Sequence, residues 1–480
     1  MVDRSVAVAI IGAGTAGLAA LRAARRETQD VLLIEGGAFG TTCARVGCMP
    51  SKLLIAAANR AEAVRDAATF GIDIPAWSID GVRVMQRVHD LRNAFVDSVL
   101  QSIEALPEGM ILRGRARFVS DDRLDVETQT GTVTVEAERI VIATGSRPTI
   151  PEEFANLGTR ATSEDVFEWS SLPASVGVFG AGVIGLELGQ ALSRLGVRVS
   201  LFTKDGMVGP LTDPALIEEA HTLVDEALEF VPDFRMIGFS ETEDHVTIDY
   251  SAAGREFSTT LERVLIAVGR TPNVDGLALE NTSLARDEAG IPLFDRATGR
   301  CGDSTIFIAG DAMDEAPLLH EATRSGVIAG TNAGLYPSAR TGTHAVPLTI
   351  VFSEPQIALV GSTYRALDET GTEHVVGAVD FGEQGRAQVI DRAKGRLHLY
   401  VAKGTARLLG AEMMAPEAEH LAHILAVAID RGMTVREMLD LPFYHPTLEE
   451  GLRTACCDAL ARLGEREVPR PNELAFGPGG

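Results

Sequence analysis

The chain has 480 residues, of which 45% are hydrophobic and 5% aromatic, and its 43 basic against 67 acidic side chains give a formal net charge of -24. This length is sufficient for about three domains, each with its own core. The acidic balance argues against nucleic acids and anionic membranes as partners, and no segment reaches the ~18 uncharged apolar residues that a membrane-spanning helix needs.

Cysteine content indicates the cellular compartment. Five cysteines are too few for a disulfide scaffold and are typical of a reducing environment. The first glycine motif begins at Gly12, which leaves no room upstream for a signal or transit peptide. We therefore expect a cytoplasmic protein.

The chain opens with a strand over residues 6–11, a turn with Gly12, Gly14 and Gly17, an alanine-rich helix, and a second strand over Val31–Glu35. This order is typical of a dinucleotide-binding unit, because the glycines let the backbone approach a pyrophosphate at a helix N-terminus. Glu35 ends the second strand 23 residues after Gly12, where a carboxylate accepts hydrogen bonds from ribose hydroxyls and rejects a 2′-phosphate.

Two cysteines, Cys43 and Cys48, follow this unit directly. Their spacing is not that of a zinc knuckle or a thioredoxin motif, and no other Cys or His pair has ligand spacing, so we expect no metal. Redox chemistry and two buried free cysteines both fit the spacing; the adjacent nucleotide unit favours redox chemistry and predicts that this unit holds FAD. A helix expected over residues 50–68 would place Cys48 near its first turn, where the helix dipole lowers the pKa of a thiol.

A second glycine motif, with Gly180, Gly182 and Gly185, repeats the strand–turn–helix–strand order in the second third of the chain. Two such units are much stronger evidence than one. Counting 23 residues from Gly180 leads to Thr203, followed by Lys204. No acid favours NAD there, and one lysine that could meet a 2′-phosphate is equally consistent with a solvated surface residue, so the choice between NAD and NADP stays open.

The remaining segments complete two interleaved nucleotide domains. Matching turns at the ends of buried strands, called strand exits below, occur at Thr144-Gly145 and at Gly269. A third buried strand leads to Asp311, whose carboxylate could accept a hydrogen bond from a ribityl or ribose hydroxyl. The predicted fold is α/β, with two Rossmann-like domains for FAD and NAD(P) and a C-terminal α+β interface domain. The expected boundaries are 1–150 with 276–343 for the FAD domain, 151–275 for the NAD(P) domain, 344–470 for the interface domain and 471–480 for a flexible tail.

Together these motifs resemble the pyridine nucleotide–disulfide oxidoreductases, over roughly residues 5–465. Within that family the chain is most similar to the bacterial lipoamide dehydrogenases. By resemblance, Cys43 matches the thiol that exchanges with substrate, and Cys48 matches the thiol that contacts the flavin and forms a charge-transfer pair. Lys52 matches the lysine near flavin N5, and Glu187 matches the carboxylate that pairs with it.

The resemblance also assigns residues further along the chain. Asp311 matches the flavin ribityl contact, and His320 lies in the following helix near the flavin. His445, with Glu450 three residues after Thr447, matches the catalytic base and its carboxylate partner. Thr447 and Glu450 also have the spacing of a capping box, which would hold the pair rigidly. In the family the histidine comes from the other subunit, which implies a homodimer with shared active sites.

Two features depart from the family pattern. Phe443 stands where many lipoamide dehydrogenases have a second histidine, which bears on the substrate pocket. The vicinal pair Cys456 and Cys457 resembles the metal-delivering pair of mercuric reductases. It falls within a helical pattern, however, and His445 stands where the mercury enzymes have tyrosine, so a packing role is favoured.

The resemblance implies oxidation of free or protein-bound dihydrolipoamide through the Cys43–Cys48 disulfide and FAD to NAD(P). An NADPH-dependent disulfide reductase of the glutathione or mercuric type is the alternative within the family. A flavin-bearing redox scaffold with incidental activity is the alternative from another class. Which lipoyl complex supplies the substrate is not readable from the chain.

Overall fold

The computed structural model describes residues 2–464, so the expected tail over 471–480 and the last residues of the expected interface domain lie outside the described part. The first sheet is built around the first glycine motif. Strand β1 pairs in parallel with β2 and β6, and β17 joins β6 from much later in the chain. Strands β5 and β4 extend the sheet in antiparallel fashion. Its strands are β1 (Arg4–Ile11), β2 (Val31–Glu35), β3 (Ile111–Arg113), β4 (Arg115–Ser120), β5 (Arg123–Thr128), β6 (Gly131–Ile142) and β17 (Ile306–Ile308).

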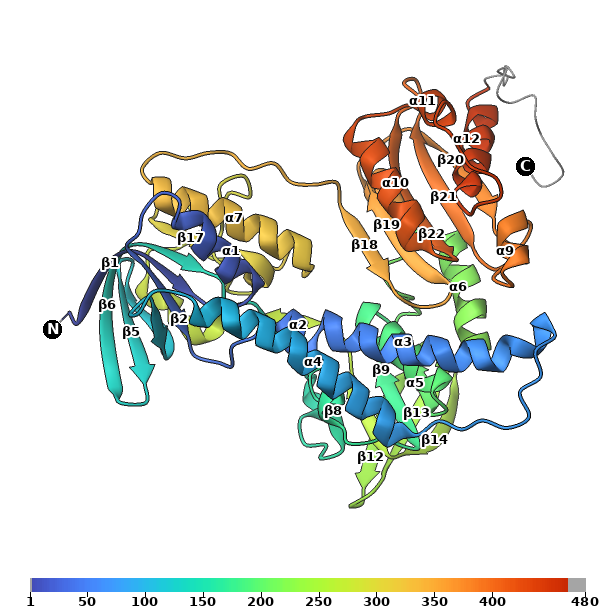
Figure 1. Ribbon diagram of the computed structural model, residues 1–480, viewed down its shortest axis with the longest axis horizontal. Coiled ribbons are helices and arrows are strands. Elements are labelled where there is room, and N and C mark those ends of the chain that lie inside the picture. Colours follow the sequence, from blue (N-terminus) through green and yellow to red (C-terminus); the bar gives the residue numbers. More distant parts are fainter. Residues whose placement is uncertain (1, 465–480) are drawn as a thin grey trace.

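Helices α1 (Thr15–Ala24) and α7 (Leu319–Leu335) share one core cluster with the first sheet and pack against each other (Figure 1). They approach closely because Gly326 and Gly330 of α7 face the backbone of α1. A Cβ at either position would lie 2.3 Å from a carbonyl oxygen of α1. This contact joins the late segment of the chain to the first nucleotide unit.

A helical segment follows β2. It comprises α2 (Thr42–Val46), α3 (Cys48–Arg65) and, after a loop, α4 (Gly81–Glu104). The helix expected over 50–68 therefore starts two residues earlier, at Cys48, and a 3₁₀ turn over Asp66–Phe70 continues it. Buried residues of α3 and α5 share one hydrophobic cluster, so the cysteine-bearing helix is anchored on the second nucleotide unit.

The second sheet is fully parallel and has the order β11-β10-β9-β15-β8. A three-stranded antiparallel sheet is inserted before its strand β15 and closes over a cluster of aromatic rings, in which Phe179 stacks on Phe202 and Phe234 packs at an angle to both. The elements are β8 (Arg160–Thr162), β9 (Ser175–Phe179), α5 (Val183–Arg194), β10 (Arg198–Phe202), α6 (Pro214–Ala227), β11 (Glu229–Val231), β12 (Arg235–Glu241), β13 (Val246–Ala252), β14 (Arg255–Leu261) and β15 (Arg263–Ile266).

The exits of the two nucleotide units pair with each other. Strand β7 (Ser146–Pro148), which follows the first exit, pairs antiparallel with β16 (Arg270–Pro272), which follows the second. The side chain of Arg270 donates to the hydroxyl of Ser146 at 2.8 Å. The chain thus crosses between the two nucleotide units through one small ribbon.

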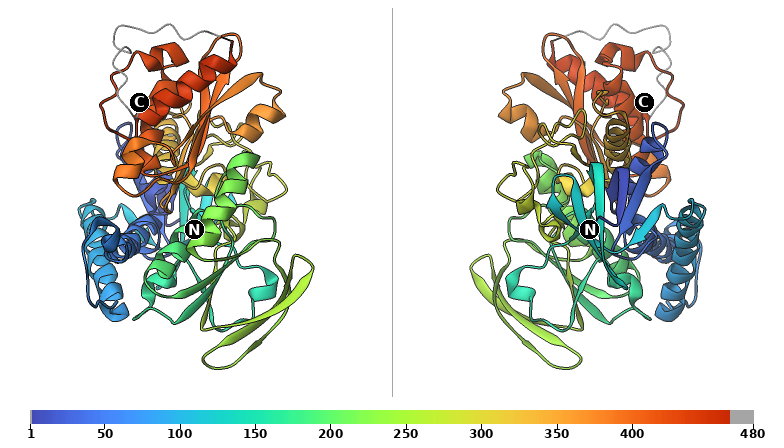
Figure 2. Two further views of the ribbon diagram at one scale, coloured as in Figure 1. Left: turned by 90° about the vertical axis from the view of Figure 1, so that its right-hand side faces the viewer. Right: turned by 90° about the vertical axis from the view of Figure 1, so that its left-hand side faces the viewer.

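The C-terminal sheet is antiparallel, with the order β18-β19-β22-β21-β20. Its alternation separates two faces: Ala358 and Val360 pack with the C-terminal helices, whereas Ile357 and Leu359 pack on the second nucleotide unit. In the side views this region, in red and orange, is stacked on the nucleotide domains (Figure 2). The elements are β18 (Leu348–Val351), β19 (Gln356–Gly361), α8 (Tyr364–Glu369), β20 (His374–Asp380), α9 (Gly385–Val389), β21 (Arg396–Ala402), β22 (Leu408–Ala415), α10 (Ala418–Asp430), α11 (Val435–Leu439) and α12 (Glu450–Arg462).

Candidate active site

The two cysteines of the first motif lie on consecutive helices. Cys43 is in α2 and half-buried, and Cys48 is the first residue of α3 and exposed. Gly47 joins the helices, and a Cβ there would lie 3.1 Å from the Cα of Cys43. The tight junction brings the two thiols within hydrogen-bond distance of each other at the N-terminus of α3.

The two thiols differ in acidity. A hydrogen bond from Cys43 stabilises the thiolate of Cys48, and together with the positive charge of Lys52 it lowers the pKa of Cys48 to about 6. The partial removal of water from this thiol by its neighbours and the charge of Glu187 oppose the shift. The same hydrogen bond, together with burial, raises the pKa of Cys43 well above its usual range. In the reduced pair these contacts favour the thiolate on Cys48 and the proton on Cys43.

Lys52 lies one turn along α3 and is paired with Glu187 of α5. The Lys52 Nζ is 2.6 Å from Oε2 of Glu187, whose side chain is only 4% exposed. Ser51 donates its hydroxyl to the same oxygen at 2.9 Å, and the Phe352 N–H donates to the other oxygen at 3.1 Å. The Lys52 ammonium also lies over the ring of Phe352, 4.7 Å from its centroid. Three separate parts of the chain thus fix this lysine beside the dithiol.

The first glycine motif fits a dinucleotide. The first turn of α1 has no side-chain cap and no acidic residue, so its N–H groups are available to a pyrophosphate. A Cβ on Gly12 would lie 2.3 Å from the Ala143 carbonyl and one on Gly17 1.8 Å from that of Gly12, whereas the space around Gly14 is open. Gly12 and Gly17 therefore serve close packing, and Gly14 leaves room for a ligand.

Polar groups that a dinucleotide could contact lie at the ends of the neighbouring strands. Glu35 accepts from the N–H groups of Ala13 and Gly37, each at 2.6 Å, which orients its carboxylate at the edge of the motif. The hydroxyl oxygen of Thr144 is buried without a hydrogen-bond partner. A buried unpaired hydroxyl is costly, so its position beside the glycine turn fits a ligand that supplies the missing bond.

Asp311 lies in a 3₁₀ turn over Gly310–Met313, directly after β17. Its Oδ2 accepts from the Ser146 hydroxyl at 2.7 Å, and Asn273 donates to the carbonyl of Gly145 at 2.9 Å. The structure thus gathers the strand exits and Asp311 at one edge of the first sheet, the edge where ligands bind in open α/β sheets. His320 lies in the first turn of α7, with its side chain 47% exposed.

The second glycine motif repeats the geometry of the first. A Cβ on Gly180 would lie 2.4 Å from the Ala267 carbonyl and one on Gly185 1.8 Å from that of Gly180, whereas Gly182 faces open space. The first turn of α5 has no side-chain cap and no acidic residue. Gly269 accepts a hydrogen bond from the Thr149 N–H at 3.0 Å. The motif therefore fits a second dinucleotide.

Thr203 and Lys204 follow β10 at the position that Glu35 holds in the first unit. Thr203 is buried and donates its hydroxyl to Asp205 at 2.9 Å. Lys204 is exposed and lies 2.8 Å from Glu153 in an ion pair that lowers the pKa of Glu153. This position thus carries no carboxylate of its own for a ribose.

His445 and Glu450 form a hydrogen-bonded pair. The His445 Nδ1 is 3.0 Å from Oε1 of Glu450, which begins α12, and the bond between His445 and Pro446 is cis. The predicted capping box forms only in half. Glu450 accepts from the Thr447 N–H at 3.0 Å, but the Thr447 hydroxyl donates to the Tyr444 carbonyl, and α12 begins only at Glu450.

The dyad and the dithiol lie in different parts of the chain's fold. Figure 1 shows α12 at the outer end of the C-terminal region, whereas α2 and α3 lie beside the nucleotide sheets. The His445 side chain is 59% exposed. The structure therefore gathers Cys43, Cys48, Lys52 and Glu187 into one group and His445 with Glu450 into another.

The vicinal cysteines lie inside α12. Cys456 is fully buried in the C-terminal core, and burial raises its pKa to about 12. Cys457 is half-buried and packs against the same core. A thiol held neutral in a hydrophobic core is a poor metal ligand, so the packing role favoured by the helical pattern agrees with its surroundings.

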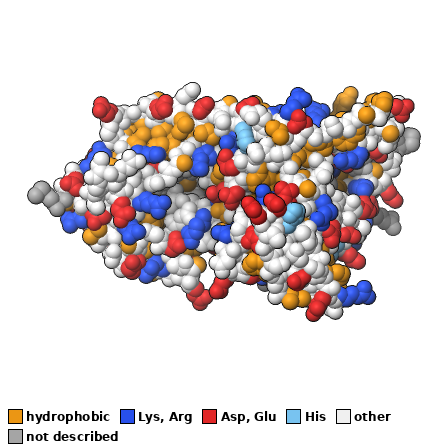
Figure 3. All heavy atoms as spheres, turned by 90° about the horizontal axis from the view of Figure 1, so that it is seen from below, with side chains coloured by type: hydrophobic (Ala, Val, Ile, Leu, Met, Phe, Trp, Pro, Cys, Tyr) orange, Lys and Arg blue, Asp and Glu red, His pale blue; other side chains and the backbone are white. Residues whose placement is uncertain are grey.

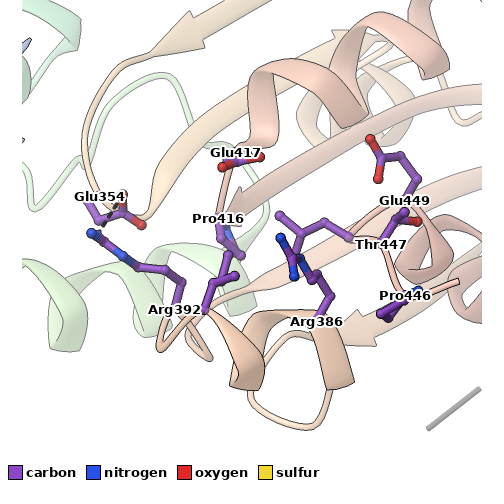
Figure 4. A pocket seen from close by; sticks show the side chains of 10 residues that line it. Glu354, Arg386, Arg392, Pro416, Glu417, Pro446, Thr447 and Glu449 are labelled. Carbon is purple, nitrogen blue, oxygen red and sulfur yellow. Dashed lines mark ion pairs between the residues drawn. The ribbon is translucent and has the colours of Figure 1, made fainter. Parts of the chain in front are cut away.

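A cavity of about 450 Å³ lies beside the dyad (Figure 4). Pro446 and Thr447 line one end of it, and the ion pair of Arg392 with Glu354, at 3.1 Å, lies at the other. No cysteine lines this cavity. It belongs to the C-terminal domain and is separate from the dithiol.

Several contacts of the site were not predicted from the sequence. Ser51 could have been found, because it lies within the Pro-Ser-Lys segment that singled out Lys52. Phe352 and Arg270 carry no local signal, because their contacts join segments far apart in the chain.

Within the described residues no helix is long and apolar enough to cross a membrane. Acidic and basic side chains are mixed over the face shown in Figure 3.

Comparison with known proteins places the chain in a family. Residues 6–326 match the pyridine nucleotide-disulphide oxidoreductase model, and residues 347–456 match the dimerisation domain of the same family. The dihydrolipoyl dehydrogenase of Bacillus subtilis is 30% identical over 460 residues, covering 94% of this chain and 98% of the relative. That of Haloferax volcanii is 32% identical over 469 residues, covering 94% and 96%.

Solved structures share the fold. The HOCl-induced flavoprotein disulfide reductase RclA from Escherichia coli, as its Cu(II) complex, gives a TM-score of 0.81 at 23% identity, covering 94% of this chain and 99% of that one. LpdA from Mycobacterium tuberculosis gives 0.80 at 24% identity, also covering 94% and 99%. The match to the dimerisation domain supports a homodimer. The chain is therefore a member of the pyridine nucleotide–disulfide oxidoreductases, enzymes that use FAD and NAD(P).

Proposed function

We propose that the protein is a dihydrolipoyl dehydrogenase, which oxidises free or protein-bound dihydrolipoamide and reduces NAD(P). The observation that carries this proposal is the Cys43–Cys48 pair, held beside a fixed lysine, together with an intact His445–Glu450 dyad. Curated dihydrolipoyl dehydrogenases that span nearly the whole chain support it. The buried position of Cys456 disfavours the mercuric reductase alternative.

In this proposal the two cysteines have distinct roles. In the oxidised enzyme a substrate thiolate attacks Cys43, the Cys43–Cys48 bond breaks, and Cys48 leaves as a thiolate. Its low pKa makes Cys48 the better leaving group and the stable thiolate. The second substrate thiol then displaces Cys43, which releases oxidised lipoamide and leaves both cysteines reduced.

His445 would act as the general base in this exchange. Its Nε2 would take the proton of the incoming thiol, while Glu450 holds Nδ1 and stabilises the imidazolium. Because the dyad and the dithiol lie apart within one chain, we propose that His445 completes the site of the partner subunit. The active form is then the homodimer.

The remaining site residues would hold the cofactors. Gly12, Gly14, Gly17 and Glu35 would bind the adenosine diphosphate part of FAD. The strand exits and the following turn would contact the rest of FAD through Thr144, Gly145, Asp311 and His320. Lys52 and Glu187 would flank its ring, and when bound, FAD accepts the electron pair of the dithiol and supplies it to the nicotinamide. The second motif would bind NAD(P) through Gly180, Gly182, Gly185, Thr203, Lys204 and Gly269.

We also propose the domain limits 1–150 with 276–343, 151–275 and 344–470, because the seven-stranded sheet, the parallel five-stranded sheet and the C-terminal five-stranded sheet each fall within one of these ranges. A cytoplasmic location is proposed from the few cysteines, which suit a reducing compartment.

The test is steady-state turnover of the FAD-loaded homodimer with dihydrolipoamide and either NAD or NADP. We expect rapid turnover that Cys43→Ser abolishes and His445→Gln lowers by about 10²–10⁴-fold. Cys457→Ala is the matched control and should retain activity. Reduction of a glutathione-type disulfide by NADPH without dihydrolipoamide oxidation would instead establish the disulfide reductase. If neither reaction proceeds, the scaffold alternative gains support.

A further inference from the structure

The two glycine units can be compared atom by atom, because their hydrogen bonds have the same register. The Gly12 N–H donates to the Ile34 carbonyl at 2.8 Å, and the Gly180 N–H donates to the Phe202 carbonyl at 2.8 Å. Thr203 therefore occupies the position of Glu35. This equivalence places the adenosine ribose of the second nucleotide beside Thr203 and the residues that surround it.

The surroundings of the two positions differ in charge. In the first unit two N–H groups fix a carboxylate, that of Glu35, at the position where a ribose would lie. In the second unit Thr203 offers a hydroxyl that is turned to Asp205, whose Oδ1 also accepts from the Met207 N–H. No carboxylate of the Glu35 type therefore rejects a 2′-phosphate at this position.

Arg235 supplies a cation that the sequence motif did not reveal. It begins β12, and its Nη1 donates to the Lys204 carbonyl at 2.7 Å and to the Phe234 carbonyl at 2.9 Å. Among the described residues its guanidinium has no carboxylate partner. The two carbonyl contacts hold the guanidinium against the Thr203–Lys204 turn and leave other N–H groups for an anion.

Lys204 is the second cation at this turn, and the ion pair that it now forms is weak. Its ion pair with Glu153 joins side chains that are 60% and 35% exposed. Pairs this exposed contribute little to stability, because water and salt screen the two charges. A phosphate with a charge of about -1.5 to -2 competes well for such a lysine.

We infer that Lys204 and Arg235 form a 2′-phosphate subsite and that the second coenzyme is NADP(H). The inference deepens the proposed function, on whose pyridine nucleotide site it rests. Arg235 would bind the phosphate through its remaining N–H groups. Lys204 would break its ion pair with Glu153 and contact the phosphate instead. The Thr203 side chain itself brings no carboxylate to the ribose, and the neighbouring carboxylate of Asp205 is held by the Thr203 hydroxyl and the Met207 N–H.

The test measures binding without catalysis. Adenosine 2′,5′-bisphosphate and 5′-AMP are titrated into the FAD-loaded homodimer by calorimetry. We expect the bisphosphate to bind at least about tenfold more tightly, since charge-assisted hydrogen bonds contribute that much or more. Its affinity should also fall with added salt more steeply than that of AMP. Equal affinities, or tighter binding of AMP, would overturn the inference.

Variants distinguish a specific role of the two cations in phosphate binding from a general effect on nucleotide binding. Arg235→Ala and Lys204→Ala should each weaken the bisphosphate about tenfold and leave AMP unchanged. Arg117→Ala, which removes an exposed arginine of the first sheet, is the charge control and should change neither. Glu153→Gln frees Lys204 and should strengthen the bisphosphate a few-fold. Equal losses for both nucleotides would mean a structural role only.

A substitution at Thr203 tests the inference in the opposite direction. Thr203→Glu gives the second unit the carboxylate of the first and should reverse the preference in favour of AMP. Failure of dihydrolipoamide turnover with intact bisphosphate binding would refute the proposed function and leave this subsite standing. Turnover with NAD, together with preferred binding of AMP, would refute the subsite alone.

Discussion

The thiols of Cys43 and Cys48 are chemically identical in the sequence and acquire different acidities through their contacts. Cys48 accepts a hydrogen bond from Cys43 and feels the charge of Lys52, so its pKa is about 6. Cys43 is the donor, and its thiol is stabilised in the protonated form. The division of labour between a leaving thiolate and an exchanging thiol therefore originates in single contacts.

This difference predicts the pH dependence of alkylation. In the reduced protein, carboxymethylation of Cys48 by iodoacetate should rise with a midpoint near pH 6. Cys43→Ala removes the donor and should move the midpoint towards the ordinary thiol value of about 8.5. Mass spectrometry of the labelled peptide measures it. Cys301→Ala, which removes a thiol buried elsewhere, is the control, and an unchanged midpoint in Cys43→Ala would contradict the assignment.

Burial decides how much the pair of Lys52 with Glu187 contributes to stability. Glu187→Ala should lower the free energy of unfolding by about 2 kcal/mol, because it leaves Lys52, Ser51 and the Phe352 N–H without their shared partner. Glu226→Ala is the matched control: it breaks a lysine–glutamate pair of 2.7 Å whose side chains are 59% and 52% exposed. That loss should stay below about 1 kcal/mol in urea unfolding. Equal losses would show that burial is irrelevant here.

At the scale of one element, helix α5 shows why two glycines in the same helix have different roles. A Cβ on Gly185 would lie 1.8 Å from the carbonyl oxygen of Gly180, so the helix can approach the turn only without a side chain. One turn later, a Cβ on Gly189 would meet its nearest atom, on Val178, at 3.7 Å, an ordinary contact. Spacing in the sequence does not distinguish the two positions.

This contrast predicts opposite effects of the same substitution. Gly185→Ala should lower the thermal midpoint and weaken nucleotide binding, because helix and turn must separate. Gly189→Ala should be neutral or stabilise by up to about 1 kcal/mol, because alanine favours a helix interior. Calorimetric melting of both variants measures the contrast. Comparable destabilisation by both would mean that α5 tolerates no side chain on this face.

Across the whole molecule, a buried polar cluster joins the C-terminal sheet to the second nucleotide unit. Asp213, which caps α6, accepts from His398 of β21 at 2.7 Å and from the Tyr400 hydroxyl at 3.1 Å. Burial raises the pKa of Asp213, but the hydrogen bonds, led by that from His398, outweigh burial and hold the pKa below its usual value. The domain contact therefore depends on an ionised carboxylate.

The sign of this shift predicts an acid-sensitive contact. The pKa of Asp213 is lower in the folded than in the unfolded protein. Its contribution to the free energy of unfolding is therefore present above the unfolded-state pKa of about 3.9 and is lost as the pH falls through the folded-state pKa. Wild type should exceed Asp213→Asn in urea stability by about 1–3 kcal/mol at neutral pH. This advantage should shrink below about pH 4. A difference that does not vary with pH would contradict it.

The separation of dithiol and dyad predicts complementation between inactive subunits. Cys43→Ser and His445→Gln homodimers should each be nearly inactive. After subunits are mixed equally and exchanged, heterodimers carry one intact site, so roughly a quarter of wild-type activity should return. Activity measured before and after exchange tests this. No recovery, despite heterodimers seen by native mass spectrometry, would place both residues in one subunit's site.

Short motifs located much of the candidate site in advance. The two glycine units, the adjacent cysteines and the His445–Glu450 segment each lie within a few dozen residues, so local patterns reveal them. The contacts that tune them could not be predicted in this way: Lys52 meets Glu187 across 135 positions, and Arg235 reaches Lys204 across 31. Such pairs depend on which helix packs on which sheet.

The sequence by itself determined the fold class, both nucleotide units and the positions of the two cysteines, because backbone periodicity and glycine turns are local properties. Only the tertiary structure decided which cysteine is the thiolate, which glycine of α5 is indispensable and what surrounds Thr203. Acidity, close approach and charge complementarity depend on distances of a few ångströms between groups far apart in the chain. Those distances exist only after the core has packed.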